Sequence, residues 1–204
     1  MNSCESKLAV TGHVLITDPK TGDVLFDNYN SINFENLSVA IVQSLISGPL
    51  NASLTGQNGF IYKMVFGNGG TTVDSSGIIT YNPPNTVGST ASLYNQTYSK
   101  VVNNQFSANS DALNNNLTYN HIPGKSFTDI VVSCLLDYGE PAGQLAFDNA
   151  NSMDNQFAFD ELGLESVSGL LLSHVIYSPI IKSNNRTILI TYTIRISTLS
   201  SLIN

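Results

Sequence analysis

Charged residues are scarce in this chain, at 11% of the sequence against roughly 25% in an average soluble domain. The eight Lys and Arg residues are scattered between Lys7 and Arg195 without forming a basic stripe, and the net charge is −7. Proteins that bind nucleic acid directly neutralise several neighbouring phosphates with clustered basic side chains. The sequence therefore predicts no direct nucleic-acid partner.

Long hydrophobic runs are also missing. The sequence has no stretch of 18 consecutive apolar residues, so we expect no membrane partner. Residues 1–7 lack the basic and apolar regions of a secretory signal peptide. Synthesis and folding in a cytoplasm are the expectation that follows.

Cysteine is rare and tryptophan is absent. Cys4 and Cys134 are too few and too far apart for a disulfide framework or a thiolate metal site. Cys134 lies in the apolar run 130–136, which predicts a small core residue rather than a reactive thiol.

The reactive groups form no pattern that is typical of an enzyme. His13, His121 and His174 are isolated from one another, and no Gly-x-Ser-x-Gly nucleophile elbow is present. The glycines of residues 67–70 are not followed by the Lys and helix of a phosphate-binding loop. We interpret them as a turn that needs positive φ. We therefore predict no catalytic residue and no cofactor.

A cluster of acidic residues leaves one alternative open. Asp148, Asp154, Asp160 and Glu161 could together suggest a calcium site. Residues 148–154, however, lack the central glycine and the alternating oxygen ligands of a calcium-binding hand loop. No metal is the prediction, with irregular calcium binding as the alternative.

A carbohydrate-directed module is the alternative from a different functional class. Asp137 and Glu140 could pair as glycosidase carboxylates, and Tyr94, Tyr98 and Tyr138 would suit stacking on sugars. The absence of Trp weakens this interpretation, and the spacing of the two carboxylates favours a solvated turn equally well.

Asparagine and apolar residues are abundant. The chain has 24 Asn and is 42% hydrophobic over 204 residues, so it should fold rather than remain disordered. A surface of amides has few charges to desolvate, and charge depletion is typical of the core of protein interfaces. We expect residues 1–204 to form a single structural domain.

The first unit, residues 1–50, is predicted to be a β-hairpin plus a helix. Strands near 14–16 and 24–26 flank the turn 18–23, which contains Pro and Gly. A helix of about residues 34–47 should follow, because apolar residues recur there without β-strand alternation.

The predicted helix has clear boundaries and an unusual surface. Asn33 or Asn36 can cap its start, and Gly48-Pro49 should end it. Its apolar residues occupy more than one face, so more than one side needs cover. Either the helix is sandwiched within the subunit or one face packs on a neighbour.

The remainder, 60–196, is predicted to be a β-rich body of short strands. The expected strands are 60–66, 94–102, 127–136, 157–164, 170–177 and 187–196. Because no strand–helix alternation is present, a doubly wound parallel sheet is improbable. The predicted fold is mainly β, an antiparallel sandwich or barrel-like domain with one packed α-helix. The Asn-rich loops 72–92 and 103–123 are expected to wrap onto an adjoining subunit.

Five stretches of the chain resemble virion structural proteins of tailed bacteriophages. They are residues 11–25, 33–38, 64–71, 137–143 and 159–164, and together they make the resemblance extend over nearly the whole chain. A second, weaker similarity is to the attachment domains that begin the tail fibres of contractile-tailed phages. It involves residues 64–70, 80–86, 160–164 and 170–179. A fibre shaft and a receptor-binding tip have no counterpart before Asn204, which favours an adaptor or ring subunit.

The resemblance implies a non-enzymatic structural subunit of the phage virion, in the neck, tail or baseplate. Its expected partners are other virion proteins and further copies of itself in a homo-oligomeric ring, and its expected location is the virion. A capsid decoration protein is the alternative within virions. The residues that we expect at interfaces are Leu37, Val39, Ile41, Val42, Ile46, Tyr81, Pro83, Tyr94 and Tyr98.

Overall fold

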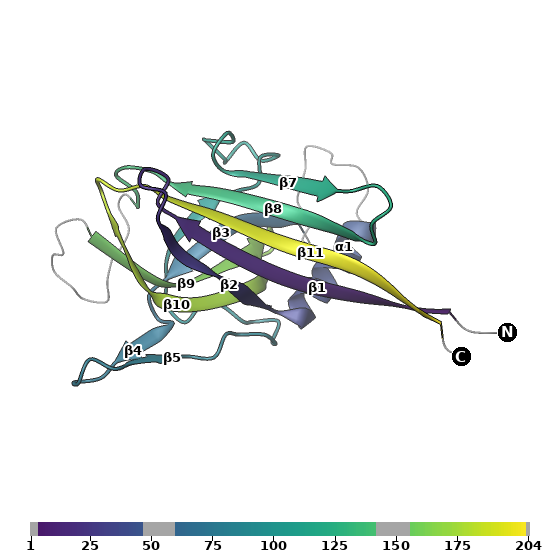
Figure 1. Ribbon diagram of the computed structural model, residues 1–204, viewed down its shortest axis with the longest axis horizontal. Helices are drawn as coiled ribbons and strands as arrows, with labels where there is room; N and C mark the ends of the chain where they lie inside the picture. The colour runs from purple at the N-terminus through teal and green to yellow at the C-terminus, as the bar shows by residue number, and fades with distance from the viewer. Residues whose placement is uncertain (1–3, 47–59, 142–155, 203–204) are drawn as a thin grey trace.

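The computed structural model describes residues 4–46, 60–141 and 156–202. Nine of its strands form one antiparallel sheet in the order β6-β3-β9-β10-β2-β1-β11-β8-β7, and β4 pairs with β5 in a separate small hairpin (Figure 1). The elements in chain order are β1 (Cys4–Thr17), β2 (Val24–Ile32), α1 (Phe34–Ile46), β3 (Ile61–Gly67), β4 (Thr71–Val73), β5 (Ile79–Tyr81), β6 (Gln96–Val101), β7 (Asn116–His121), β8 (Phe127–Leu136), β9 (Gln156–Ser166), β10 (Leu171–Ser183) and β11 (Ile188–Leu202).

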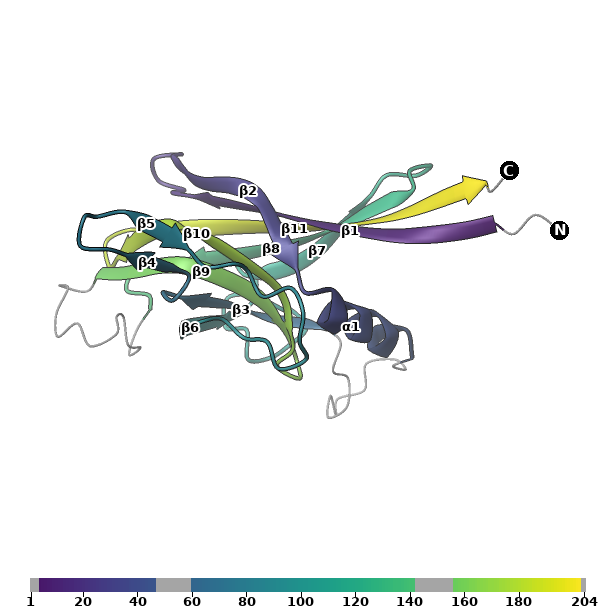
Figure 2. The ribbon, with the colours of Figure 1, turned by 90° about the horizontal axis from the view of Figure 1, so that it is seen from below.

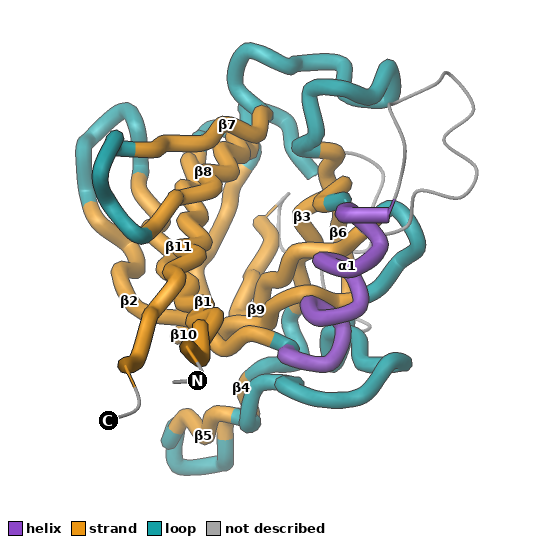
Figure 3. Tube along the Cα trace, turned by 90° about the vertical axis from the view of Figure 1, so that its right-hand side faces the viewer, coloured by secondary structure: helices purple, strands orange, loops and turns teal. Residues whose placement is uncertain are grey.

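The sheet curls into a half-barrel. In Figure 3, β7, β8, β11 and β1 form one wall and β3, β6 and β9 form the other, with α1 beside the second wall. The prediction of a mainly β, antiparallel, barrel-like fold with one helix is confirmed. A curled sheet shelters its concave face without a second sheet, so one layer can hold the core.

Strict alternation along the central strands builds that core. Val14 of β1 lies opposite Tyr192 of β11, and Ile16 lies opposite Ile190. All four side chains are buried and share one cluster with residues of the opposite wall such as Phe66. The hairpin predicted as part of the first unit therefore supplies β1 and β2 to the middle of the sheet.

The turn between β1 and β2 forms as its sequence predicts. The Asp18 backbone amide donates to the Asp23 carbonyl at 2.9 Å, and the Asp18 carboxylate accepts the amides of Lys20 and Thr21. Gly22 has φ 79°, which only glycine adopts at little cost.

The helix α1 spans residues 34–46, within one residue of the predicted end. Asn33 is its cap, because its side-chain oxygen accepts the Asn36 amide at 3.1 Å. The predicted stop at Gly48-Pro49 lies outside the described residues. Among described residues, no helix is long and apolar enough to span a membrane.

Three short strands lie where the sequence predicts loops. The β4–β5 hairpin begins at Thr71 and otherwise falls inside the predicted loop 72–92, and β7 falls inside the predicted loop 103–123. β7 is polar and pairs on one side only, with β8. Its sequence therefore lacks the apolar pattern by which a buried strand is recognised.

The two central strands extend beyond the rest of the sheet. β1 and β11 pair along their whole lengths, but β2 reaches along β1 only to Gly12 and β8 reaches along β11 only to Ser197. The outer ends therefore continue as a two-stranded projection, seen at the right of Figure 2. We call residues 4–8 and 198–202 the projecting ribbon. At about 3.3 Å per residue it is roughly 15–20 Å long.

Candidate functional site

Strands β3 and β9 meet at one buried polar site. β9 pairs with β3 so that Glu161 lies opposite Gly67, at the point where β3 ends. Asp160 and Glu161 of β9, together with His174 of β10, are each less than 5% exposed. We call these three residues the carboxylate clip.

Asp160 fixes the turn that leaves β3. Its Oδ1 accepts the Gly70 amide at 2.9 Å, and its Oδ2 accepts both the amide of Thr71 at 2.8 Å and its hydroxyl at 2.5 Å. Burial raises the pKa of the Asp160 carboxyl, against the opposing effect of the Thr71 hydrogen bond. The carboxylate therefore holds the start of β4 at the rim of the sheet.

Glu161 fixes a second segment to the same rim. Its Oε1 accepts the amides of Gly69 at 3.1 Å and Asn95 at 2.8 Å, and its Oε2 accepts the Tyr94 amide at 2.9 Å. The His174 Nε2 lies 3.0 Å from the same Oε2. Burial alone would raise the pKa of Glu161, but these hydrogen bonds outweigh it and lower the pKa below its usual value.

His174 acts as a bridge in this network. Its Nδ1 accepts the Asn85 amide at 3.0 Å, so Nε2 carries the proton that is donated to Glu161. Both ring nitrogens are therefore engaged, and the side chain is fully buried. The clip ties β9, β10, the 67–71 turn and the 82–95 segment into one rim.

Close backbone approach explains the glycines of this turn. A Cβ at Gly67 would lie 2.4 Å from the Asn95 carbonyl oxygen, one at Gly69 would lie 2.8 Å from the Asn95 nitrogen, and one at Gly70 would lie 2.8 Å from the Asp160 carbonyl oxygen. None of the three has positive φ. The prediction of a positive-φ turn was therefore wrong, because tertiary crowding requires these glycines.

The geometry of the clip favours a structural role. Each oxygen of both carboxylates accepts at least one hydrogen bond from within the chain. A general base or nucleophile needs a lone pair directed at a substrate. The sequence does mark this site, because two adjacent acidic residues interrupt the apolar run 157–164.

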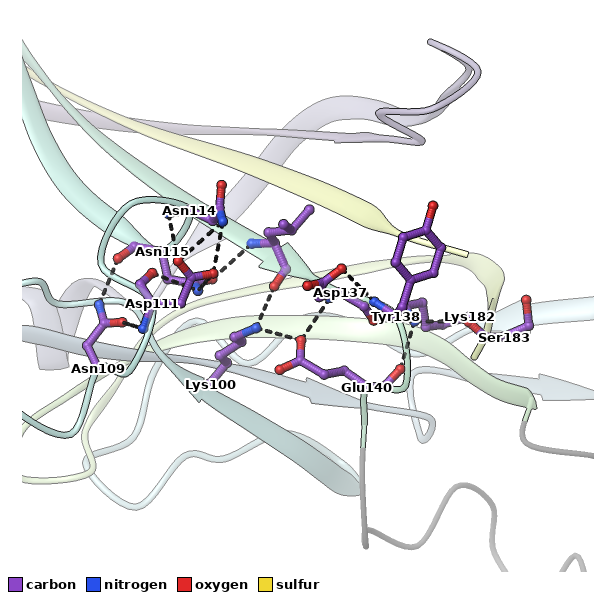
Figure 4. Close-up of polar contacts among 11 residues, drawn as sticks. Lys100, Asn109, Asp111, Asn114, Asn115, Asp137, Tyr138, Glu140, Lys182 and Ser183 are labelled. Carbon is purple, nitrogen blue, oxygen red and sulfur yellow. Dashed lines mark hydrogen bonds and ion pairs between the residues drawn. The ribbon is translucent and has the colours of Figure 1, made fainter. Parts of the chain in front are cut away.

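A second polar site connects the two walls, where β6, β8 and β10 end (Figure 4). The Lys100 Nζ donates to the Leu135 carbonyl at 2.7 Å and lies 2.5 Å from the Glu140 Oε2. The same Glu140 oxygen accepts the Asp137 amide at 2.8 Å. Glu140 thus closes a turn, in which it is paired with Lys100 rather than solvated.

Lys182 supports that turn from inside. It is fully buried, and its Nζ donates to the carbonyls of Asp137, Glu140 and Ser183 at 2.9, 2.7 and 3.0 Å. Burial lowers the pKa of this ammonium to about 8. The buried cation is stabilised by three backbone acceptors.

The Asn-rich loop folds onto its own chain. Asn115 is fully buried, and its side-chain oxygen accepts the Leu135 amide at 2.9 Å, beyond the end of β7. Asn109 donates to the Asn115 carbonyl at 2.7 Å, and Asn103 donates to the Ile61 carbonyl at 2.6 Å. We expected such amides to bind a neighbouring subunit, but these three satisfy backbone groups of the chain itself.

The structure divides the predicted interface residues into several groups. Tyr81 and Tyr94 are 49% and 45% exposed, and Pro83 is exposed between them in sequence. The Tyr94 hydroxyl donates to the Pro83 carbonyl at 2.8 Å. Tyr98 lies in the core beside Phe66, because alternation along β6 directs it to the concave side. Tyr98 is therefore not a surface residue, which corrects that expectation and also removes it from the glycan-stacking alternative.

The helix residues of that prediction also lie in different places. Val39 is 41% exposed, whereas Leu37 and Ile41 line an apolar hollow of about 390 Å³ between α1 and the strands. Val42 and Ile46 belong to α1, but their side chains lie outside the described part of the structure.

The remaining candidates of the sequence are accounted for individually. Cys134 is fully buried, and burial raises the pKa of its thiol to about 12, as expected for a core residue. His13 lies 2.7 Å from Asp27 on the outer face, and His121 contacts the Thr128 hydroxyl. The 148–154 segment of the calcium alternative lies outside the described residues. Elsewhere in the described chain, no group of three or more His, Cys, Asp or Glu side chains could hold a metal ion.

Comparisons of the chain with protein-family models, with curated proteins and with solved structures find no match.

Proposed function

We propose that this chain is a non-enzymatic structural subunit of a tailed-phage virion that acts by assembling with copies of itself and with other virion proteins. The resemblance of its sequence to such proteins motivates the proposal. The projecting ribbon is the single observation that carries it. A strand edge without a partner is a template for pairing with another chain.

The projecting ribbon has little to stabilise it when the chain is not bound to a partner. A two-stranded ribbon without further strands is marginally stable in water. β2 pairs with β1 only as far as Gly12, and β8 pairs with β11 only as far as Ser197. Both outer edges of the described ribbon therefore lack a strand partner. A third strand from another subunit would satisfy these backbone groups.

Exposed apolar side chains give further support. The β4–β5 hairpin presents Val73 and Ile78, which are 60% and 63% exposed, and Tyr81 beside them. Phe34 and Val39 of α1 are 62% and 41% exposed. A partner that packs on either element would cover these exposed side chains.

We place the subunit at the neck, tail or baseplate, with the capsid surface as the alternative. A glycan-directed role gains no comparable support, because Glu140 is engaged by Lys100 and by the Asp137 amide. Asp137 itself accepts the Tyr138 amide at 2.7 Å.

The test is to locate the chain in particles. Infected-cell lysates are fractionated on a density gradient, and the chain is quantified in the particle band by mass spectrometry. We expect a fixed ratio to the other virion proteins and incomplete particles when a stop codon interrupts the gene. Recovery of the chain only in the soluble fraction, with normal particles after interruption, would contradict the proposal. An Asp137→Ala variant serves as the control and should assemble normally.

A further inference from the structure

The longer free edge of the projecting ribbon belongs to β1. β2 leaves β1 beyond Gly12 and pairs with β10 instead, where Ser31 lies opposite His174. This departure opens a hollow of about 380 Å³ beside Thr11, into which another strand could continue. Among the described strands, none pairs with the outer edge of β1 from Cys4 to Thr11, whereas the outer edge of β11 is free only over 198–202.

The charges on this edge are self-complementary. Glu5 and Lys7 are two residues apart on one strand, so they share a face. Within the chain they lie opposite Ser201 and Leu199, which are uncharged. The register positions opposite both charged residues on β11 are therefore uncharged.

An antiparallel pair of two β1 strands centred on Ser6 would provide that partner. In this register Glu5 of each copy lies opposite the partner's Lys7, and the two ion pairs are related by a two-fold axis. Leu8, which is 55% exposed, lies opposite the partner's Cys4. A parallel, in-register pair would instead place like charges together, which is destabilising.

The edge of β11 is the less suitable partner. Residues 198–202 carry no charge, so pairing β1 of one copy with β11 of another would leave Glu5 and Lys7 without cross-strand partners. Edge charges normally prevent strand addition. Here they permit it for one specific occupant, an antiparallel second copy of the same strand.

We propose that two copies of this chain join through their projecting ribbons by antiparallel pairing of β1 with β1, centred on Ser6. This inference deepens the proposed function and rests on it, because it names the partner of the ribbon. The result is a four-stranded sheet, β11-β1-β1-β11, that spans two subunits.

A cysteine at the two-fold axis reports this pairing. In the full chain with Cys4→Ser, the variant Ser6→Cys places two thiols opposite each other across the axis, within the Cβ separation that a disulfide needs. We expect a covalent dimer under mild oxidation, detected on a non-reducing gel. The matched control is Ser200→Cys, which lies opposite Ser6 on β11 of the same ribbon and should remain monomeric on that gel.

Charge reversal then tests the register. In the Ser6→Cys background, Glu5→Lys and Lys7→Glu each place like charges opposite one another, and each should reduce the dimer yield roughly tenfold. Mixing these two variants should restore a mixed dimer, which mass spectrometry identifies. The double swap Glu5→Lys/Lys7→Glu should restore the yield in a single chain.

The outcomes separate this inference from the proposed function. Equal cross-linking of the Ser6→Cys and Ser200→Cys variants, or yields that ignore charge, would overturn the two-fold pairing. So would the absence of a cross-link when the chain is still found in particles, an outcome that leaves the proposed function standing and assigns the ribbon to another virion protein. A cross-linked dimer that is absent from particles would retain the pairing and contradict the virion role.

Discussion

The carboxylate clip and the projecting ribbon differ in whether their polar groups have partners within the described chain. At the clip, five backbone amides and an imidazole are directed at Glu161 or at its neighbour Asp160. Along β1 from Cys4 to Thr11, no strand in the described part of the chain lies beside the outward backbone groups. The first region is complete within one chain, and the second is complete only with another strand.

This difference separates folding from assembly. Buried polar groups are costly unless each has a partner, so the clip must form before the rim of the half-barrel is stable. Val14 and Ile16 are the buried core residues of β1, with Val10 packed against the core, and all three lie outside the projecting ribbon. Changes at the clip should therefore affect stability, and changes at the ribbon should affect association.

The largest effect is expected for Glu161→Gln. The amide nitrogen would face backbone donors where a carboxylate oxygen now accepts them, and His174 would lose its charged partner. We expect a loss of about 3–5 kcal/mol in the free energy of unfolding, measured by urea denaturation. The control is Glu165→Gln on the same strand, whose partner Lys63 is partly exposed, with an expected loss of roughly 1 kcal/mol. Equal losses of unfolding free energy in both variants would show that Glu161 stabilises the fold no more than Glu165 does.

Gly67→Ala should have the next largest effect. Its Cβ would lie 2.4 Å from the Asn95 carbonyl oxygen, so the backbone must shift and the hydrogen bonds of Glu161 must lengthen. We expect about 2–3 kcal/mol of destabilisation in the same measurement. Gly124→Ala is the comparison, because its φ is +82° with open space around it, and strain there should cost about 1 kcal/mol. A wild-type stability for Gly67→Ala would show that crowding does not explain this glycine.

Acid should reduce the contribution of Glu161 to the free energy of unfolding. Glu161 has a pKa that is lower in the folded than in the unfolded chain, so its stabilisation is fully present above its ordinary pKa near 4.5 and is lost as pH falls through the folded value. The difference in unfolding free energy between the native chain and Glu161→Gln should therefore narrow below pH 4.5. Urea titrations from pH 7 to pH 3 measure it. A difference that stays constant over this range would mean that the charge of Glu161 is not what stabilises the rim.

The smallest effect on folding is expected for Ser6→Pro. Proline removes one backbone donor of the projecting ribbon and leaves the core untouched. The free energy of unfolding should change by less than about 0.5 kcal/mol relative to Ser6→Ala, while association through the ribbon should be lost in sedimentation measurements. A large loss of stability would show that the ribbon belongs to the cooperative core.

Local patterns predicted those parts of the fold whose neighbours are apolar. The bounds of β8, residues 127–136, match the prediction because a continuous apolar run is buried on one face and half-buried on the other. The hairpin turn followed from Asp18 and Gly22, whose requirements are local. β7 could not be predicted, because residues 116–121 are polar and become a strand only by pairing with β8.

The candidate sites were harder to predict, because they depend on segments that are far apart in sequence. Gly67 is required by Asn95, and Glu161 is stabilised by backbone amides of two distant segments and by the His174 ring of a third. Nothing local to Tyr94 and Tyr98 indicated that the first is exposed and the second is buried. The free edge of β1 is likewise a property of where β2 and β8 end.

The pairing of the first strand with the last has a consequence for biosynthesis. β1 lies between β2 and β11, so a ribosome must release residues 188–202 before the middle of the sheet can close. Until then, apolar side chains that face the interior of the half-barrel remain exposed in the nascent chain. Contacts between such distant segments make folding slow and leave the growing chain open to aggregation, so the sheet should close only after β11 has been synthesised.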